Sequence, residues 1–428
     1  MIEQSTPVWR PLLSDVLAAQ AHEAVEKIAD SLQPSSTTPI TNLSLGDGAA
    51  GIALFYAYLA QVEESEDYTA AALHYLNQAI DGAATAPLPH SLYSGLAGIA
   101  WTIMHLQGRL FEADPDAIDA AIDGTLLAAV RQSPWPYDYD LISGLLGLGV
   151  YFIERLPAPS AVVGLTHLVE RLREQAITRP DGITWWTDPH WLSAEGRTQL
   201  PTGCYDLGIA HGIAGVIALL SQLCALDCAA AHARPLLEGA VAWLLAQQLP
   251  ATAPSRFPTW VQPDGVRPPS RLAWCYGDLG IAVALLRAAR LVQEPTWEAA
   301  ASQLAQATAQ RAQAQEDVQD TGLCHGFASI AHLFNRLYQA TGDEHFAEVA
   351  RLWFTRTLAQ RRPHQGIAGF LALAPTTTTQ LEWVADPGLL TGAAGIGLAL
   401  LAALYPLPPA WDQLLLIALP ATPTAPTA

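Results

Sequence analysis

Short apolar runs recur along the chain, and each opens with the pattern Gly-x-x-Gly or a close variant of it. A run such as GAAGIALFYAYLA, from Gly48, is long enough for roughly three or four helical turns and is apolar on nearly every face. A helix of that kind is buried on all sides. We expect its glycines to permit close helix packing and unusual backbone dihedrals. The chain contains seven such runs, which begin at Gly48, Gly95, Gly144, Gly212, Gly277, Gly326 and Gly392.

Amphipathic segments lie between the apolar runs. Residues 161–177 and 343–360, for example, carry charges on one face, which is typical of helices that pack on one side only. Each repeat therefore predicts one inner and one outer helix. Because the inner helices are apolar all round, we expect an all-α fold of the α/α toroid type. Seven inner helices would form a closed ring inside seven outer helices, as a single domain over residues 1–419.

The spacing between repeats predicts insertions in the ring. Gaps of 47 to 49 residues between first glycines lengthen to between 65 and 68 in three places. The extra residues fall near 178–205, 251–270 and 364–386, and they contain the stretches ITWW, FPTWV and TTTTQLEWV. Such β-branched and aromatic stretches favour short strands or ordered loops. The low-complexity end, residues 420–428, is expected to be disordered.

Composition and charge exclude several classes of partner. Apolar residues make up 51% of the chain, charged residues 14%, and the formal net charge is −19. An acidic surface repels phosphate backbones and anionic lipids, so we expect no nucleic-acid partner. Residues 388–411 carry no charge and are long enough to span a bilayer, but prolines at 406, 408 and 409 interrupt them. A buried helix is the better interpretation, and we do not expect an integral membrane protein.

The cysteines indicate a reducing compartment. The chain has five, an odd number, and they are far apart, which is not a disulfide framework. The first residues, MIEQSTPVWR, lack the features of a signal peptide. We therefore expect a cytoplasmic protein. Cys224 and Cys228 are interpreted as core residues of an apolar helix, and the sequence assigns no role to Cys204.

Alignment of the seven copies on their first glycine reveals a line of polar positions. The residue before that glycine is polar in every copy, although the helix that follows is apolar. In a closed ring, equivalent positions face the same mouth of the barrel, so one mouth is lined with polar groups at the inner-helix N-termini. These residues are Asp47, Ser94, Ser143, His211, Tyr276, His325 and Thr391.

Three side chains at this mouth predict a metal site. Cys275 and Cys324 share the same register position, two residues before the first glycine, in neighbouring repeats, and His325 follows Cys324 directly. Two thiolates and one imidazole with an open fourth position is the way in which catalytic zinc is held. Helix N-termini nearby favour anionic thiolates. Asp140, in DYDLISG, directs a carboxylate to the same mouth.

With these residues the chain resembles the lanthipeptide cyclases, the LanC-like proteins. The stretches AHGIAG (210–215), RLAWCYGDLG (271–280) and CHG (324–326) carry the resemblance, which extends over almost the whole chain. It implies an α/α toroid with one Zn²⁺ bound by Cys275, Cys324 and His325. It also implies active-site roles for Asp140, His211, Arg271 and Tyr276. One departure is Ser329, where the family usually keeps a glycine; its role is open, and we expect it to affect helix packing, not ligation.

The resemblance implies a carbon–sulfur bond-forming reaction. A peptide cysteine thiol adds to dehydroalanine or dehydrobutyrine and closes a thioether ring in a lanthipeptide precursor. His211 is the expected acid, Asp140 sets its charge or tautomer, and Arg271 or Tyr276 stabilises the enolate oxygen. The expected partners are a dehydrated precursor peptide and a separate dehydratase, because the seven repeats use nearly the full length.

Three alternatives remain at this stage. A LanC-like zinc protein that binds glutathione, or adds other thiols to dehydroamino acids, would present the same mouth residues. A protein prenyltransferase also activates a thiol on zinc but needs a basic diphosphate pocket, and only Arg271 is basic near these motifs. An α/α glycosidase would use paired carboxylates such as Asp47 and Asp278.

Overall fold

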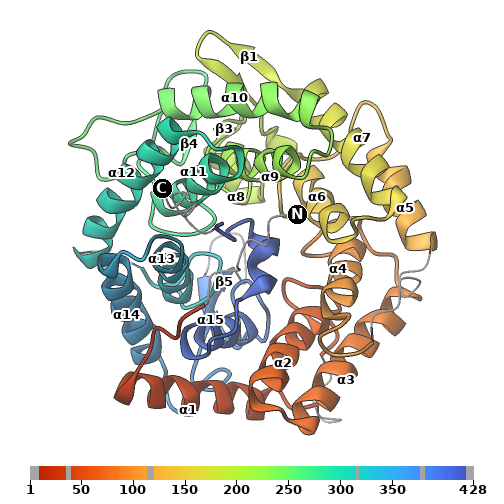
Figure 1. Ribbon diagram of the computed structural model, residues 1–428, viewed down its shortest axis with the longest axis vertical. Coiled ribbons are helices and arrows are strands. Elements are labelled where there is room, and N and C mark those ends of the chain that lie inside the picture. The colour runs from red at the N-terminus through yellow and green to blue at the C-terminus, as the bar shows by residue number, and fades with distance from the viewer. Residues whose placement is uncertain (1–8, 35–39, 113–119, 315–317, 376–380, 421–428) are drawn as a thin grey trace, which may run out of the picture.

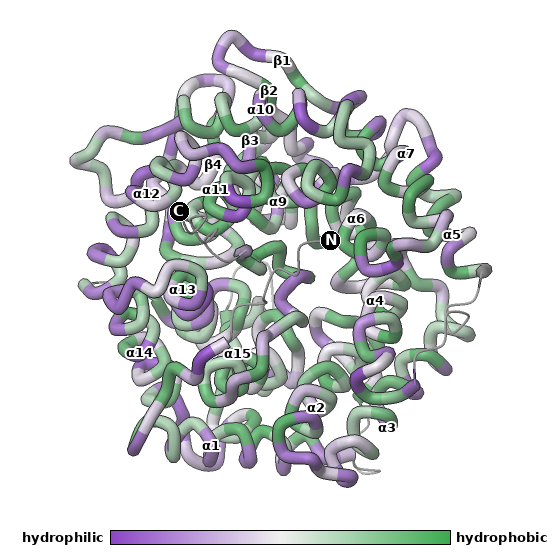
Figure 2. Tube along the Cα trace, viewed as in Figure 1, coloured by the Kyte–Doolittle hydropathy of each residue, from purple (hydrophilic) through white to green (hydrophobic). Residues whose placement is uncertain are grey.

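The helices of the computed structural model, which describes residues 9–34, 40–112, 120–314, 318–375 and 381–420, form two concentric rings (Figure 1). The seven apolar runs form the inner ring, as predicted. Nearly every residue in these helices is buried, and they are mostly green in the hydropathy view of Figure 2. Their bounds are α2 (Ala49–Glu63), α4 (Leu96–Leu106), α6 (Leu145–Glu154), α9 (Ile213–Ala225), α11 (Asp278–Val292), α13 (Phe327–Thr341) and α15 (Ala393–Leu404).

The outer ring consists of the amphipathic segments. In the first of them the buried residues Ala21, Ala24, Val25 and Ile28 recur at intervals of three or four, which makes a single apolar stripe. The predicted α/α toroid is confirmed. The outer helices are α1 (Asp15–Ser31), α3 (Glu66–Ala83), α5 (Ala120–Val130), α7 (Pro159–Gln175), α10 (Ala230–Ala246), α12 (Pro295–Ala314) and α14 (Glu344–Ala359).

The two ends of the chain close the ring together. Most inner helices pack against the outer helix that follows them; α4 contacts both α3 and α5, and α15 packs against α1. The backbone N–H groups of Leu12 and Leu13 donate to the carbonyl of Ala403 at 2.8 and 3.1 Å. The indole N–H of Trp9 donates to the carbonyl of Ala402 at 2.7 Å. The seventh helix pair is therefore built from the first and last helical segments of the toroid.

The first glycine of each repeat is the N-cap residue of its inner helix, and close approach explains most of these glycines. A Cβ atom at Gly95 would lie 2.1 Å from the carbonyl oxygen of Pro89, and one at Gly212 would lie 2.3 Å from that of Asp206. The unusual dihedral expected at these glycines occurs only at Gly277, where φ is 108°; the other six have extended backbone. Backbone contact, more than backbone conformation, thus excludes a side chain here.

A belt of backbone hydrogen bonds joins the repeats at the mouth where the inner helices begin. At six of the seven junctions of the ring it links the residues two or three before the first glycine of neighbouring repeats. The belt holds equivalent positions side by side, as the register predicts. Its N–H to carbonyl pairs are Leu141 to Ala210 (3.0 Å), Ala210 to Cys275 (3.4 Å), Cys275 to Cys324 (3.2 Å), Cys324 to Leu390 (2.7 Å), Leu390 to Gly46 (3.1 Å) and Gly46 to Tyr93 (2.8 Å).

The insertions form three small antiparallel sheets. They pair β1 (Ile177–Arg179) with β2 (Gly182–Thr184), β3 (Tyr205–Asp206) with β4 (Trp260–Val261), and β5 (Ala372–Pro375) with β6 (Leu381–Val384). The first insertion also contains the 3₁₀ helix η1 (Pro189–Trp191) and the short helix α8 (Ala194–Gln199). Strands thus occur where β-branched and aromatic residues predict them. Residues 376–380, and residues 421–428 of the expected disordered tail, lie outside the described residues.

The segment after α15 turns back into the centre of the ring (Figure 1). It contains the 3₁₀ helix η2 (Ala410–Leu415). The Tyr93 hydroxyl donates a hydrogen bond to the carbonyl of Leu414 (2.9 Å), and the indole N–H of Trp274 donates to the carbonyl of Leu415 (3.0 Å). Because Tyr93 and Trp274 lie at the mouth, this segment reaches the underside of the belt. Among the described helices, none is long and apolar enough to cross a membrane.

Candidate metal centre and active site

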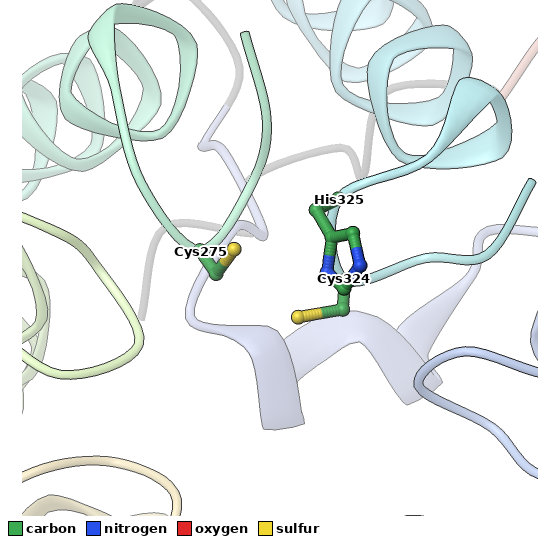
Figure 3. A group of neighbouring side chains, drawn as sticks. All are labelled: Cys275, Cys324 and His325. Carbon is green, nitrogen blue, oxygen red and sulfur yellow. The ribbon is translucent and has the colours of Figure 1, made fainter. Parts of the chain in front are cut away.

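Cys275 and Cys324 lie directly before α11 and α13, in two neighbouring repeats. The belt hydrogen bond from Cys275 N to Cys324 O holds their backbones together at 3.2 Å. The ligand atoms of Cys275, Cys324 and His325 all lie within 4.8 Å of one another, and Figure 3 shows the three side chains converging from two loops. The structure thus brings together the three residues that the register predicts as ligands.

His325 has the features of a histidine prepared to bind a metal ion. Its Nδ1 atom is buried without a hydrogen-bond partner, and its Nε2 atom lies 3.7 Å from Oδ2 of Asp320. A carboxylate beside one ring nitrogen orients a ligating histidine and fixes its tautomer. Two thiolates with one imidazole form a donor set that suits zinc. The residues present therefore fit the metal ion that the family resemblance implies.

The two thiols differ in acidity. Burial disfavours the Cys275 thiolate, but polar contacts with Cys324 and His325 and the positive charge of Arg271 outweigh it and hold the pKa of Cys275 well below its usual range. Arg271 Nη2 donates to Cys275 Sγ at 3.2 Å. The hydrogen bond to Cys275, together with burial, raises the pKa of Cys324. Cys275 therefore has thiolate character, which is the form that binds metals.

His211 and Asp140 form a hydrogen-bonded pair at the same mouth. Asp140 Oδ2 lies 2.7 Å from His211 Nδ1, and the carboxylate is 2% exposed while the imidazole is 36% exposed. Burial favours the neutral imidazole, but the hydrogen bond and charge of Asp140, with the charge of Asp206, raise the pKa of His211 to about 9. His211 is thus protonated at neutral pH and accessible from the mouth.

Tyr276 and Arg271 connect this pair to the cysteines. The rings of His211 and Tyr276 stack with centroids 5.7 Å apart, and the guanidinium carbon of Arg271 lies 5.6 Å from the centroid of the Tyr276 ring. Arg271 in turn contacts the sulfur of Cys275. The seven predicted site residues therefore form one continuous chain of contacts, which runs through Asp140, His211, Tyr276, Arg271, Cys275, Cys324 and His325.

Two carboxylates of the site, Asp206 and Asp320, were missed by sequence reasoning. Asp206 accepts hydrogen bonds from Tyr276 and from the N–H of Gly208, the latter at 2.7 Å. Burial raises the pKa of Asp206 to about 6. Asp320 accepts the N–H of Gly322 at 2.8 Å and lies beside His325. Asp206 therefore orients Tyr276, and Asp320 lies beside the imidazole of His325.

A second register position carries these carboxylates. Six residues before the first glycine, five of the seven repeats have an acid or an amide, and each accepts a backbone N–H of its own loop. This signal is present in the sequence, but it lies outside the two positions, one and two residues before the first glycine, that predict the metal site. The residues are Asn42, Asp138, Asp206, Asp320 and Asp386.

Other residues that the sequence analysis considered for a function lie outside this chain of contacts. Asp278, half of the carboxylate pair that a glycosidase would need, is buried and accepts the N–H groups of Arg256 and Phe257, each at 2.9 Å. Because that carboxylate already accepts backbone hydrogen bonds within the fold, it gives no support for a glycosidase.

Cys204 is buried and pairs by its backbone with Thr187 in the first insertion. Cys228 follows the end of α9, so it is not inside the apolar helix as expected.

Comparisons with known proteins agree with the fold and the motifs. The model of the lanthionine synthetase C-like protein family matches residues 39–416. The nisin biosynthesis protein NisC of Lactococcus lactis subsp. lactis is 25% identical over 334 residues, which cover 72% of this chain and 77% of that protein. A solved structure of nisin cyclase matches with a TM-score of 0.72 and 20% identity, over 93% of this chain and 97% of the other. The chain belongs to the lanthionine synthetase C-like protein family.

Proposed function

We propose that the protein is a zinc-dependent lanthionine cyclase. It adds cysteine thiols of a dehydrated lanthipeptide precursor to dehydroalanine or dehydrobutyrine and forms (methyl)lanthionine rings. The observation that carries the proposal is the convergence of Cys275, Cys324 and His325 within 4.8 Å, connected by side-chain contacts to the protonated, accessible His211. Family membership and the similarity to NisC support a lanthionine synthetase-type enzyme.

Cys275, Cys324 and His325 hold the metal ion in this proposal. A zinc ion at this site would lower the pKa of a substrate thiol so that the thiol loses its proton near neutral pH. Arg271 and Asp320 flank the ligands with opposite charges. Their charges offset each other, so a Zn²⁺ ion held by the two cysteine thiolates and joined by a substrate thiolate would leave the site with a net negative charge. That charge favours a nucleophilic substrate sulfur.

His211 moves the protons of the reaction. The substrate sulfur forms a bond to the β-carbon, the carbon–carbon π bond breaks, and its electron pair moves onto the neighbouring carbonyl oxygen. As the carbonyl bond re-forms, the protonated imidazole donates a proton to the α-carbon. It then regains one proton, equal in number to the proton that the substrate thiol released, so the reaction has no net change in protons. Asp140 keeps the imidazole charged and oriented through the 2.7 Å hydrogen bond.

Arg271 and Tyr276 have different roles in the proposed reaction. One Arg271 nitrogen contacts Cys275 Sγ, and a guanidinium has further N–H donors that stabilise the enolate oxygen as it gains charge. Tyr276 donates its hydroxyl to Asp206 and stacks on His211. We assign Tyr276 to the orientation of the imidazole, because its hydroxyl is already engaged by a carboxylate.

The proposed cyclase acts on a peptide in the cytoplasm. The substrate is a precursor peptide that a separate dehydratase has already processed. None of the five cysteines forms a disulfide in the structure, which suits a reducing cytoplasm.

The proposal is tested by incubating the protein with a dehydrated, cysteine-containing precursor. Free thiols are then labelled with an alkylating reagent and counted by mass spectrometry. Loss of labelling without change in peptide mass is expected, since ring closure is an isomerisation. A parallel incubation with the same peptide and glutathione tests the alternative: mass gain by glutathione addition, with peptide thiols still labelled, would contradict cyclase activity and favour a thiol-adding LanC-like protein.

A further inference from the structure

Ser329 occupies a position that is glycine in every other repeat. The six equivalent residues are three after the first glycine of each copy, at a place where consecutive repeats pack closely. At Gly98, for example, an added Cβ would lie 1.8 Å from the carbonyl oxygen of Leu92 and 2.9 Å from Cβ of Leu45 in the preceding repeat. These glycines are Gly51, Gly98, Gly147, Gly215, Gly280 and Gly395.

The Ser329 side chain makes a specific hydrogen bond across this contact. Its Oγ atom accepts the backbone N–H of Trp274 at 3.1 Å. Ser329 and Trp274 are both 0% exposed, so water does not compete for that N–H group. A buried N–H without a partner is costly, and the serine hydroxyl supplies the partner.

The hydrogen bond lies at the junction between the two cysteine-bearing repeats. Trp274 precedes Cys275, whose own N–H donates to the carbonyl of Cys324 at 3.2 Å. Two successive N–H groups of the fifth repeat therefore donate to different groups of the sixth. The indole of Trp274 is also fixed, by its 3.0 Å hydrogen bond to the carbonyl of Leu415. The backbone of Trp274 and Cys275 is thus hydrogen-bonded to the sixth repeat, which carries Cys324, and the Trp274 side chain is hydrogen-bonded to the central segment.

We propose that Ser329 is a positioning residue for the metal centre, and that it sets the distance of Cys275 from Cys324 and His325. This proposal rests on the metal site proposed above. Metal ligands must be placed to within a few tenths of an ångström, so a backbone that shifts to satisfy an orphaned Trp274 N–H would misplace the Cys275 sulfur. Ser329 therefore affects ligation as well as packing, whereas the sequence predicted an effect on packing alone.

The test compares Ser329→Ala and Ser329→Gly with the wild-type chain. Ser329→Gly restores the residue found in the other six repeats, so it should fold even if the alanine variant does not. A matched control is Ser221→Ala, which removes another fully buried inner-helix serine, in α9, whose hydroxyl donates only to Ala218 O at 2.9 Å. Zinc affinity is measured by competition with a chromogenic chelator, and thiolate-to-cobalt absorption is recorded after Co²⁺ substitution.

We expect both Ser329 variants to bind zinc at least about tenfold more weakly, as is typical for loss of groups that orient ligands. Their thiolate-to-cobalt bands should shift or weaken, and Ser221→Ala should match the wild type. Wild-type affinity and spectra in a Ser329 variant, even with lowered thermal stability, would overturn this proposal and leave the metal site intact. Failure of the wild-type chain to bind zinc would instead overturn the metal site itself.

Discussion

At the scale of single residues, the register of the seven repeats predicted the metal site better than the Cys-His motif did. Adjacent Cys-His is weak evidence for a metal site, but the belt bond from Cys275 to Cys324 shows why equivalent positions of neighbouring repeats meet. The same logic, applied six residues before the glycine, would have found Asp206 and Asp320. Register also singled out Ser329, but the partner of its hydroxyl is a backbone N–H of the neighbouring repeat, which the sequence does not identify.

The acid role of His211 predicts a specific pH profile. With its pKa raised to about 9, His211 is protonated below that pH, so cyclisation should slow as the pH rises through about 9. Asp140→Asn removes the negative charge that opposes the effect of burial on the pKa of His211, so the decline should move to lower pH, toward the ordinary histidine value of about 6.5. The measurement is the pH dependence of initial thiol loss in the precursor.

Exposed Asp264 supplies the control for that profile. Asp264→Asn should leave the alkaline decline where it is in the wild type. An unchanged decline in Asp140→Asn, or full cyclisation by His211→Ala, would remove this pair from the mechanism.

At the scale of helices, the pattern of apolar positions predicted the elements and the glycines located their starts. The inner helices begin directly after the first glycine of each copy, and this residue is glycine because a side chain there would collide with the backbone of the preceding loop. The pairing order was not predictable from periodicity. Only the contacts show that most inner helices pack on the outer helix that follows, and that α1 completes the last pair with α15.

The glycine contacts predict opposite effects of one substitution at two positions. Gly95→Ala would place Cβ 2.1 Å from the Pro89 carbonyl, whereas a Cβ at Gly124, exposed in α5, meets nothing within 4 Å. Gly95→Ala should destabilise the protein by about 1–3 kcal/mol or more. Gly124→Ala should stabilise it by about 0.5–1 kcal/mol through helix propensity. Urea unfolding measures both, and equal effects of the two substitutions would contradict the interpretation of the N-cap glycines.

At the scale of the whole molecule, the toroid followed from buried, all-apolar helices, but the filling of its centre did not. Residues 405–419 are largely apolar, but no repeat pattern places them in the centre of the ring, since their polar contacts are with residues distant in the sequence. Asp412, for example, is fully buried and binds Arg336 and His332 of α13, the latter at 2.8 Å. Paired charges at such separations cannot be recognised from local spacing.

That buried cluster predicts a large loss of stability on substitution. Asp412→Ala would leave the Arg336 guanidinium buried without its carboxylate, which typically costs about 3–5 kcal/mol. The expected result is a marked decrease in the urea midpoint of unfolding. Glu348, exposed on α14, provides the control, because Glu348→Ala should change stability by less than about 0.5 kcal/mol. A change of that small size in Asp412→Ala would show that the central segment does not stabilise the ring.

The central claim is that Cys275, Cys324 and His325 bind one zinc ion, and the zinc content of the purified protein tests it most directly. Elemental analysis should find about one zinc per wild-type chain, and close to none in Cys275→Ala or Cys324→Ala chains that retain wild-type helical circular dichroism. Cys228→Ala, which removes a buried cysteine outside the site, should keep its zinc. A folded Cys275→Ala chain that retains one zinc, or a wild-type chain that binds none, would contradict the account.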